Sequence, residues 1–142
     1  MTTQAEHVPP PETILFVEDD LVTRLDMAEY LRQAGYTVAE AVNAAEAVEA
    51  LNSKLAIDLV VTDMRMPGDM DGFALAEWIR ANRPGVAVIV ASGDELASER
   101  AEALGAFGAF LAKPYTGRAL LDAVGAELAK RPRDISGAAN AS

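Results

Sequence analysis

The sequence contains no cysteine, a single histidine and no long apolar run. Without cysteine the chain forms neither a disulfide nor a thiolate metal site. A helix that spans a bilayer needs about 20 predominantly apolar residues, and no stretch of this sequence approaches that length. Residues 1–11 combine neither a basic segment nor an apolar core, so they do not resemble a secretory signal. We therefore expect a cytoplasmic protein without a membrane partner.

Positive charge is also scarce, since 12 lysines and arginines stand against 22 aspartates and glutamates, a net charge of −10. Such a field repels nucleic-acid backbones and disfavours direct binding of DNA or RNA. It favours metal cations and partners with basic patches, although many proteins are acidic merely to stay soluble. Apolar residues make up 51% of the 142 residues, which suits one domain with a substantial core.

The two ends of the chain differ in composition from its middle. Residues 1–12 form a polar, proline-rich arm and residues 131–142 a tail of small and polar residues, and we expect both to be disordered. Residues 13–130 form the predicted domain. His7, in the arm, has no base, orienting group or co-ligand nearby, so we expect it to be exposed to solvent and not to accept a phosphoryl group or a metal.

Short apolar segments alternate with helical stretches across the domain, which indicates an α/β fold with a parallel sheet and crossover helices. Strands are expected at 13–17, 37–41, 59–62, 86–91 and 109–112. Helices are expected at about 21–33, after Asn43, at 72–82, at 96–104 and from Thr116 to 129. The candidate helix N-caps are Asp20, Asn43 and Thr116. In the first helix, the apolar stripe expected to face the sheet is Met27, Tyr30, Leu31 and Ala34.

Polar side chains stand at the carboxyl ends of four of the predicted strands. Parallel strands end at one edge of a sheet, and open α/β folds place their chemistry there, so these side chains should converge. They are Glu18, Asp19, Asp63, Ser92 and Lys113. Carboxylates, a hydroxyl and an ammonium group together are the components of a cation-assisted phosphoryl site.

Three of these residues, Glu18, Asp19 and Asp63, are expected to form an acidic cluster whose like charges repel one another unless a cation neutralises them. Three oxygen ligands plus water suit Mg²⁺, whereas Ca²⁺ usually recruits more protein ligands. With a cation present, a phosphoryl group can sit between the metal, Lys113 and the Ser92 hydroxyl, and a carboxylate can act as nucleophile. Asp63 ends the predicted central strand and is the candidate nucleophile. Glu18 and Asp19 lie side by side and are better placed to hold the metal.

The arrangement resembles the receiver domain of two-component response regulators, over about residues 12–129. The segments that carry the resemblance are Val17-Glu18-Asp19-Asp20, Thr62 to Pro67, Met70-Asp71-Gly72, Ser92-Gly93 and Phe110 to Tyr115. Each segment is weak evidence alone, but all of them in this order are highly specific. The resemblance implies a five-stranded parallel sheet in a doubly wound (βα)5 fold, with the flavodoxin-like strand order 2-1-3-4-5.

Carried onto this sequence, the resemblance makes Asp63 the phosphoacceptor. Glu18 and Asp19 would hold Mg²⁺ together with Asp63 and the backbone carbonyl at Arg65. Glu18 stands where aspartate is also common in the family and is one methylene longer. The segment 67–72 is one residue longer than the commonest version, which predicts a reshaped loop beside the acceptor.

The resemblance also assigns residues that respond to phosphorylation. Ser92, which replaces the more frequent threonine, would hydrogen-bond the phosphoryl group, and Lys113 would pair with it. Phe110 matches the aromatic switch position that turns inward when the hydroxyl residue moves; the alternative is a plain core phenylalanine. The bond between Lys113 and Pro114 is commonly cis in the family.

The leading hypothesis is a stand-alone receiver that takes a phosphoryl group from a sensor histidine kinase or a histidine phosphotransfer protein. Its signal would leave through the surface of helix 4, strand 5 and helix 5, toward a downstream protein target. An effector and a phosphorelay shuttle or sink fit equally well. We expect a monomer or a weak phosphorylation-dependent dimer. The chain would catalyse only its own phosphorylation and dephosphorylation, so it is not expected to be an enzyme.

Two other classes are compatible with the topology. An aspartyl-phosphate phosphohydrolase of the haloacid dehalogenase type needs an acid two residues after the nucleophile, where Arg65 stands here. A flavin-binding module needs a hydroxyl- and glycine-rich loop after the first strand, where Glu18-Asp19-Asp20 stands. Both alternatives are therefore disfavoured.

Overall fold

The structure, a computed structural model, describes residues 11–93 and 108–131. Its strands are β1 (Thr13–Val17), β2 (Thr37–Ala41), β3 (Leu59–Asp63), β4 (Ala87–Ser92) and β5 (Ala109–Ala112). Its helices are α2 (Leu21–Gln33), α3 (Ala44–Leu51), α4 (Gly72–Asn82) and α6 (Gly117–Lys130). The helix expected at 96–104, His7 and most of both terminal segments (residues 1–10 and 132–142) lie outside the described residues. Glu12 and Arg131, at the inner ends of these segments, are described; the Glu12 carbonyl accepts from the Thr37 amide and Arg131 pairs with Asp58. Within them, every helix is too short or too polar to cross a membrane.

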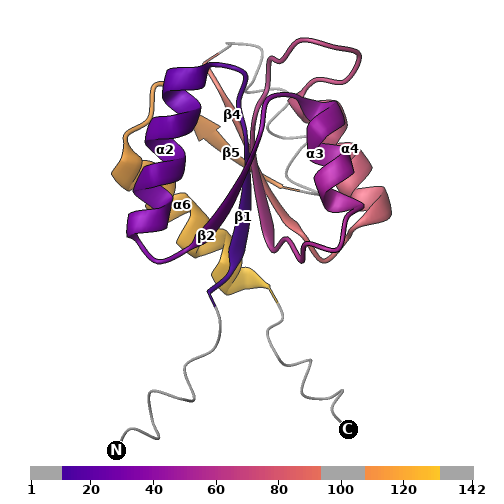
Figure 1. The fold of residues 1–142 in the computed structure, drawn as a ribbon. Coiled ribbons are helices and arrows are strands. Elements are labelled where there is room, and N and C mark those ends of the chain that lie inside the picture. The colour runs from indigo at the N-terminus through magenta and orange to yellow at the C-terminus, as the bar shows by residue number, and fades with distance from the viewer. Residues whose placement is uncertain (1–10, 94–107, 132–142) are drawn as a thin grey trace, which may run out of the picture.

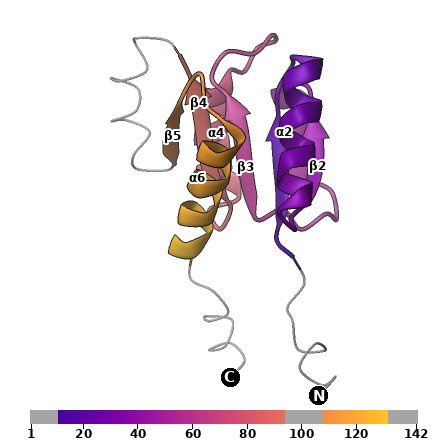
Figure 2. The ribbon, with the colours of Figure 1, turned by 90° about the vertical axis from the view of Figure 1, so that its left-hand side faces the viewer.

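The strands pair in parallel in the order β2-β1-β3-β4-β5, which confirms the expected fold and strand order. Helices α2 and α6 cover one face of the sheet, and α3 and α4 cover the other (Figure 1, Figure 2). Each face has its own apolar cluster, because successive strand residues point to opposite faces. Leu15 and Val60 belong to the α3 and α4 side, whereas Phe16 and Val61 belong to the α2 and α6 side.

Four helices begin with a side chain that caps the backbone, and each begins at the carboxyl edge of the sheet. Asp20, Asn43 and Thr116 accept hydrogen bonds from the amides three residues later, at 2.9, 2.9 and 3.0 Å, as predicted. Asp71 does the same for α4, at 2.8 Å. These caps satisfy amides that the helix leaves without partners. They therefore fix the point at which each helix starts at the carboxyl edge of the sheet, where the predicted site residues lie.

The predicted inward face of α2 is partly wrong. Leu31 is buried and Met27 is half-buried, as expected, but Tyr30 and Ala34 are exposed. The helix turns Ala28 toward the sheet in their place. Tyr30 instead lies over the start of α6, where its ring would meet a β-carbon added to Gly117. Packing against a second helix, which a single-helix periodicity does not encode, sets this rotation.

Three strand boundaries are shifted by one residue from the prediction. β4 starts at Ala87 and not at residue 86, and the carboxyl ends of β3 and β4, which matter for the site, lie one residue later than expected. β3 ends on Asp63, which pairs with Ala91, and β4 ends on Ser92, which pairs with Ala112. These two residues thus belong to the sheet and do not lie in the loops that follow. Their backbone positions are set by the ladder of the central strands.

Candidate functional site

The five residues predicted to converge do so at the carboxyl edge of the sheet. Glu18 follows β1 directly, and its amide donates to the Ala41 carbonyl at 2.9 Å, which extends the pairing of β1 with β2 by one residue. Asp63 and Ser92 end the two central strands, and Lys113 follows β5. The edge therefore brings together side chains from four strands.

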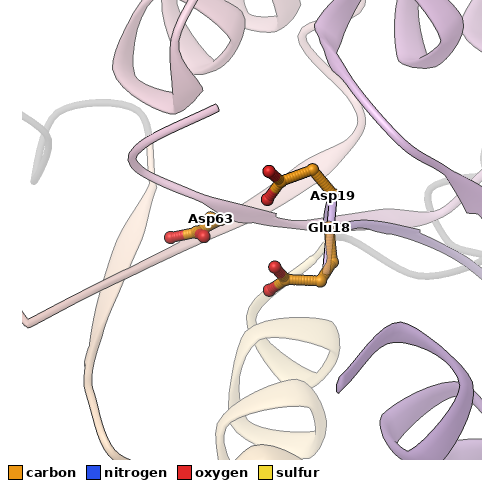
Figure 3. A group of neighbouring side chains, drawn as sticks. All are labelled: Glu18, Asp19 and Asp63. Atoms are coloured by element: carbon orange, nitrogen blue, oxygen red, sulfur yellow. The ribbon is translucent and has the colours of Figure 1, made fainter. Parts of the chain in front are cut away.

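Three carboxylates gather at the centre of this edge. Each of Glu18, Asp19 and Asp63 offers an oxygen that lies within 4.8 Å of the others. Figure 3 shows the Glu18 and Asp19 side chains leaving the chain in different directions, both extending toward the side on which Asp63 lies at the end of β3. Glu18 is buried, Asp63 is half-buried and Asp19 is exposed, so the cluster opens to solvent on the Asp19 side. This confirms that the acidic residues come together, while their roles stay predictions.

The buried member of the cluster is electrostatically strained. Glu18 is only 4% exposed, and this burial raises the pKa of its carboxyl above the ordinary value of 4.5. Asp63 and Asp19 raise this pKa further, whereas the Asp20 amide, which donates to Glu18 Oε2 at 3.1 Å, and the Lys113 ammonium lower it. A divalent cation among the three carboxylates would relieve both the repulsion and the desolvation. The donor set is all oxygen, as Mg²⁺ prefers, so the residues fit that ion.

Lys113 supplies the positive charge of the site. Its ammonium lies 3.0 Å from Asp63 Oδ1. Its amide donates to the Ser92 carbonyl at 3.1 Å, which ties the residue to the end of β4. The bond between Lys113 and Pro114 is cis, as the resemblance implied. Both a backbone contact and an ion pair thus aim this side chain at the candidate acceptor.

Ser92 and Phe110 lie on the same face of the sheet. Val90 pairs with Phe110 and Ser92 with Ala112, so Ser92 and Phe110 are two positions apart on neighbouring strands and share one face. Ser92 is 3% exposed, and Phe110 is half-buried against the apolar cluster under α3 and α4. The placement suits coupled movement, but the switch role of Phe110 stays a prediction. So does the metal-binding role of the Arg65 carbonyl; the Arg65 residue is exposed.

Three residues of the site have structural roles that the sequence analysis did not predict, although Gly72 and Tyr115 lie in segments that carry the resemblance. A β-carbon on Gly72 would overlap the Asp63 carbonyl oxygen and lie 2.9 Å from the Met64 α-carbon, so only glycine allows α4 to start against β3. Tyr115 is half-buried beside the acids. Burial, together with the charges of Glu18 and Asp63, raises its pKa to about 12, so the phenol is neutral at physiological pH.

The third unanticipated residue is Arg24 in the first turn of α2. Its Nη1 donates to the Glu18 carbonyl at 2.9 Å, and its Nε donates to Glu40 Oε1 at 3.2 Å. Two signals in the sequence point to it in retrospect. An arginine follows an acidic triplet by one helical turn, and Glu40 is the only charged residue in the strand Thr37–Ala41.

Comparison with protein families gives one match over most of the chain. The family model described as "Response regulator receiver domain" matches residues 14–125. Among curated proteins, the transcriptional regulatory protein PdtaR of Mycobacterium tuberculosis (strain CDC 1551 / Oshkosh) is 39% identical over 129 residues. That alignment covers 89% of this chain and 60% of PdtaR. A cyclic di-GMP phosphodiesterase of Thermotoga maritima is 38% identical over 78 residues, which are 55% of this chain and 20% of that protein. The chain thus spans less than two thirds of either relative.

Solved structures of similar chains agree with the fold. A response regulator receiver domain protein (CheY-like) from Methanospirillum hungatei JF-1 has a TM-score of 0.77 at 28% identity, covering 84% of this chain and 95% of that one. A response regulator receiver protein from Sinorhizobium medicae WSM419 has a TM-score of 0.74 at 32% identity. That match covers 85% of this chain and 97% of the other.

We expect Gly72→Ala to destabilise the protein by about 1–3 kcal/mol, because the added methyl collides with β3 backbone that the sheet holds in place. Thermal unfolding measures the effect. Gly125→Ala is the matched control, since this glycine lies in α6 with nothing within 4 Å of an added β-carbon. The control should gain up to about 1 kcal/mol from helix propensity. Equal responses of the two variants would contradict the assigned contact.

We expect Glu18→Gln to stabilise the metal-free protein at pH 7. The pKa of Glu18 is raised in the folded chain, so its ionisation is harder there than in the unfolded chain. The resulting penalty is absent below the ordinary value of 4.5 and grows as the pH rises through the raised pKa. Melting temperatures measured in EDTA between pH 4 and 8 should therefore converge at low pH and separate in favour of the variant at neutral pH. A variant that is less stable than the wild type at pH 7 would contradict this.

Proposed function

The chain belongs to the response regulator receiver domain family, and we propose that it accepts a phosphoryl group on Asp63. The donor is a phosphohistidine on a sensor histidine kinase or on a histidine phosphotransfer protein. The observation that carries the proposal is a half-buried Asp63 held 3.0 Å from a lysine ammonium, within an acidic cluster at the edge of a parallel sheet. A nucleophile, a countercharge and a cation site are thereby combined at one point.

The transfer we propose uses an oxygen of Asp63 as the nucleophile. That oxygen attacks phosphorus, the bond from phosphorus to the donor imidazole breaks, and the imidazole nitrogen keeps the electron pair and takes up a proton. The product on Asp63 is an acyl phosphate. Lys113, already 3.0 Å from the carboxylate, stays close enough to pair with the added phosphoryl oxygens. Attack of water on phosphorus later returns the aspartate and inorganic phosphate, so no separate substrate is turned over.

The proposed cofactor is Mg²⁺, held by Glu18, Asp19 and Asp63 and by the Arg65 carbonyl. When bound, the ion supplies charge neutralisation for the phosphoryl oxygens. Glu18 contributes a buried carboxylate. Its backbone amide is held by β2 and its backbone carbonyl by Arg24 of α2. Ser92, at the end of β4, provides the hydroxyl that meets the phosphoryl group after transfer.

The donor protein we propose approaches over the first turns of α2. Three large apolar side chains follow Asp20 there and are open to solvent: Leu21, Val22 and Leu25 are 56%, 66% and 49% exposed. A groove of about 570 Å³ lies between α2 and residues 113–115, lined among others by Met27 and Tyr115. An apolar rim beside a charged site suits a protein partner, because large exposed apolar patches mark interaction surfaces.

The output we propose is a change in the surface formed by the helix expected at 96–104, by β5 and by α6. Of these, β5 and α6 lie among the described residues. A downstream protein, and not a nucleic acid, reads this change, or the phosphoryl group passes onward through a phosphorelay. We propose a cytoplasmic location and a monomer or weak dimer. The phosphohydrolase alternative finds no support, since the position two residues after Asp63 holds the exposed Arg65.

We expect Asp63→Asn to abolish phosphorylation by acetyl phosphate in the presence of MgCl₂, because asparagine keeps the volume and removes the nucleophile. Intact-protein mass spectrometry reports the added phosphoryl group. Asp69→Asn is the control, since Asp69 is exposed in the loop that follows β3. It should be phosphorylated like the wild type. A phosphoryl group on the Asp63→Asn protein at wild-type yield would contradict the assignment of Asp63 as the phosphoacceptor.

We expect beryllofluoride to shift the NMR signals of Ser92 and Phe110 together, because the Ser92 hydroxyl moves toward the new acceptor and vacates space on the face it shares with Phe110. Ser92→Ala should reduce the Phe110 shift while Asp63 still binds the ligand. Ser53→Ala, in the exposed turn after α3, should leave the response unchanged. A full Phe110 shift in the Ser92→Ala protein would show that the two residues are not coupled.

A further inference from the structure

Arg24 connects the acidic loop to an edge strand. Its side chain is 13% exposed although it carries a full charge, and both of its hydrogen-bonding nitrogens have partners. One partner is the Glu18 carbonyl and the other is Glu40 on β2. The arginine thus spans from the loop after β1 to the neighbouring strand, close to its carboxyl end.

The contact with the Glu18 carbonyl fixes more than one atom. That carbonyl belongs to the peptide unit between Glu18 and Asp19, and the unit is planar. Holding its oxygen therefore also orients the Asp19 amide and constrains where both side chains leave the backbone. The Glu18 amide is held separately, by the Ala41 carbonyl at 2.9 Å. Both sides of this residue are tied to β2, one directly and one through Arg24.

Glu40 is itself held from two directions. Its Oε1 accepts from Arg24 at 3.2 Å and its Oε2 accepts from Arg32 at 3.1 Å. The same Arg32 Nη2 donates to the Val38 carbonyl at 2.9 Å. Arg24 and Arg32 lie in the first and last parts of α2, so Glu40 keeps the whole helix in register with the strand. It also gives the Arg24 charge an anionic partner on β2.

We propose that Arg24 and Glu40 are positioning residues that set the affinity of the acidic cluster for its divalent cation. The inference rests on the metal site of the proposed function. Without Glu40, the Arg24 guanidinium loses its anionic partner and is left beside Glu18 and Asp19, where it competes with the cation. A lysine at position 24 cannot replace the arginine, because a single ammonium does not reproduce the planar fork that reaches a carbonyl and a carboxylate together.

The test is a magnesium titration followed by the melting temperature, which rises with occupancy of a site present only in the folded state. The readout is the magnesium midpoint, the MgCl₂ concentration equal to the apparent Kd, and not the melting temperature itself. It is obtained by fitting the logarithmic rise in stability with MgCl₂ concentration. Glu40→Gln and Arg24→Lys should each raise this concentration about tenfold, the scale found when groups that orient metal ligands are removed. Arg32→Gln, which removes only the outer partner of Glu40, should give a smaller shift and serves if the first two variants fold poorly.

Arg83→Lys is the matched control. Arg83 also joins a backbone carbonyl and a side chain, donating to Leu51 O at 3.2 Å and to Asn52 Oδ1 at 2.8 Å, at the opposite edge of the sheet from the acids. Its replacement should lower the melting temperature and leave the magnesium midpoint unchanged. The Arg24→Lys, Glu40→Gln double variant should shift the midpoint by less than the sum of the single effects, as for residues that act as a unit.

The possible outcomes separate this inference from the proposed function. A wild-type protein that responds to MgCl₂, with the same midpoint in Glu40→Gln and Arg24→Lys, overturns the positioning role alone. A wild type that shows no response overturns the metal site, and the positioning role with it. A shifted midpoint in Arg83→Lys of the same size also overturns the inference, because the effect would then follow general stability.

Discussion

The repulsion among three carboxylates is the constraint on which the rest of this structure depends. Glu18, Asp19 and Asp63 place oxygens within 4.8 Å of one another, and the most deeply buried of them carries a raised pKa. An isolated chain would move these charges apart. The parallel sheet prevents that, because the ends of β1 and β3 are fixed side by side by their hydrogen bonds. The free energy of the core therefore maintains a site that is electrostatically unfavourable on its own.

Several contacts around the cluster also help to hold the three carboxylates in place. The Asp20 side chain caps α2, Arg24 holds the Glu18 carbonyl, and Lys113 places its charge on Asp63. On the other side, Gly72 lets α4 begin directly against the Asp63 carbonyl. None of these contacts removes the negative charge in full. They fix positions and leave a deficit of positive charge, which is the property that a cation site requires.

Much of this site follows from the sequence, because the rule that parallel strands end at one edge needs only the strand positions. Asp63, Ser92 and Lys113 were placed correctly on that basis, and so were the caps at Asp20, Asn43 and Thr116. The predictions that were wrong or incomplete concern residues whose surroundings depend on how helices and strands pack against one another. Tyr30 was expected to face the sheet, but its surroundings are set by α6, far along the chain. The roles of Gly72, Arg24 and Glu40 were missed for the same reason, since these roles exist only once α4 meets β3 and α2 meets β2.

The ion pair between Lys113 and Asp63 explains how such a site can remain stable before it is used. In the unphosphorylated chain the ammonium compensates one carboxylate and thereby limits the repulsion that Glu18 experiences. In the proposed function, an acyl phosphate on Asp63 replaces a charge of −1 by one approaching −2, with more acceptor oxygens. The demand for positive charge then exceeds what one lysine supplies. In the same proposal, the hydroxyl of Ser92 at the end of β4 is the neutral donor for the added charge. Phe110 lies two positions away on the same face, so the proposed movement of its ring would be a consequence of that charge.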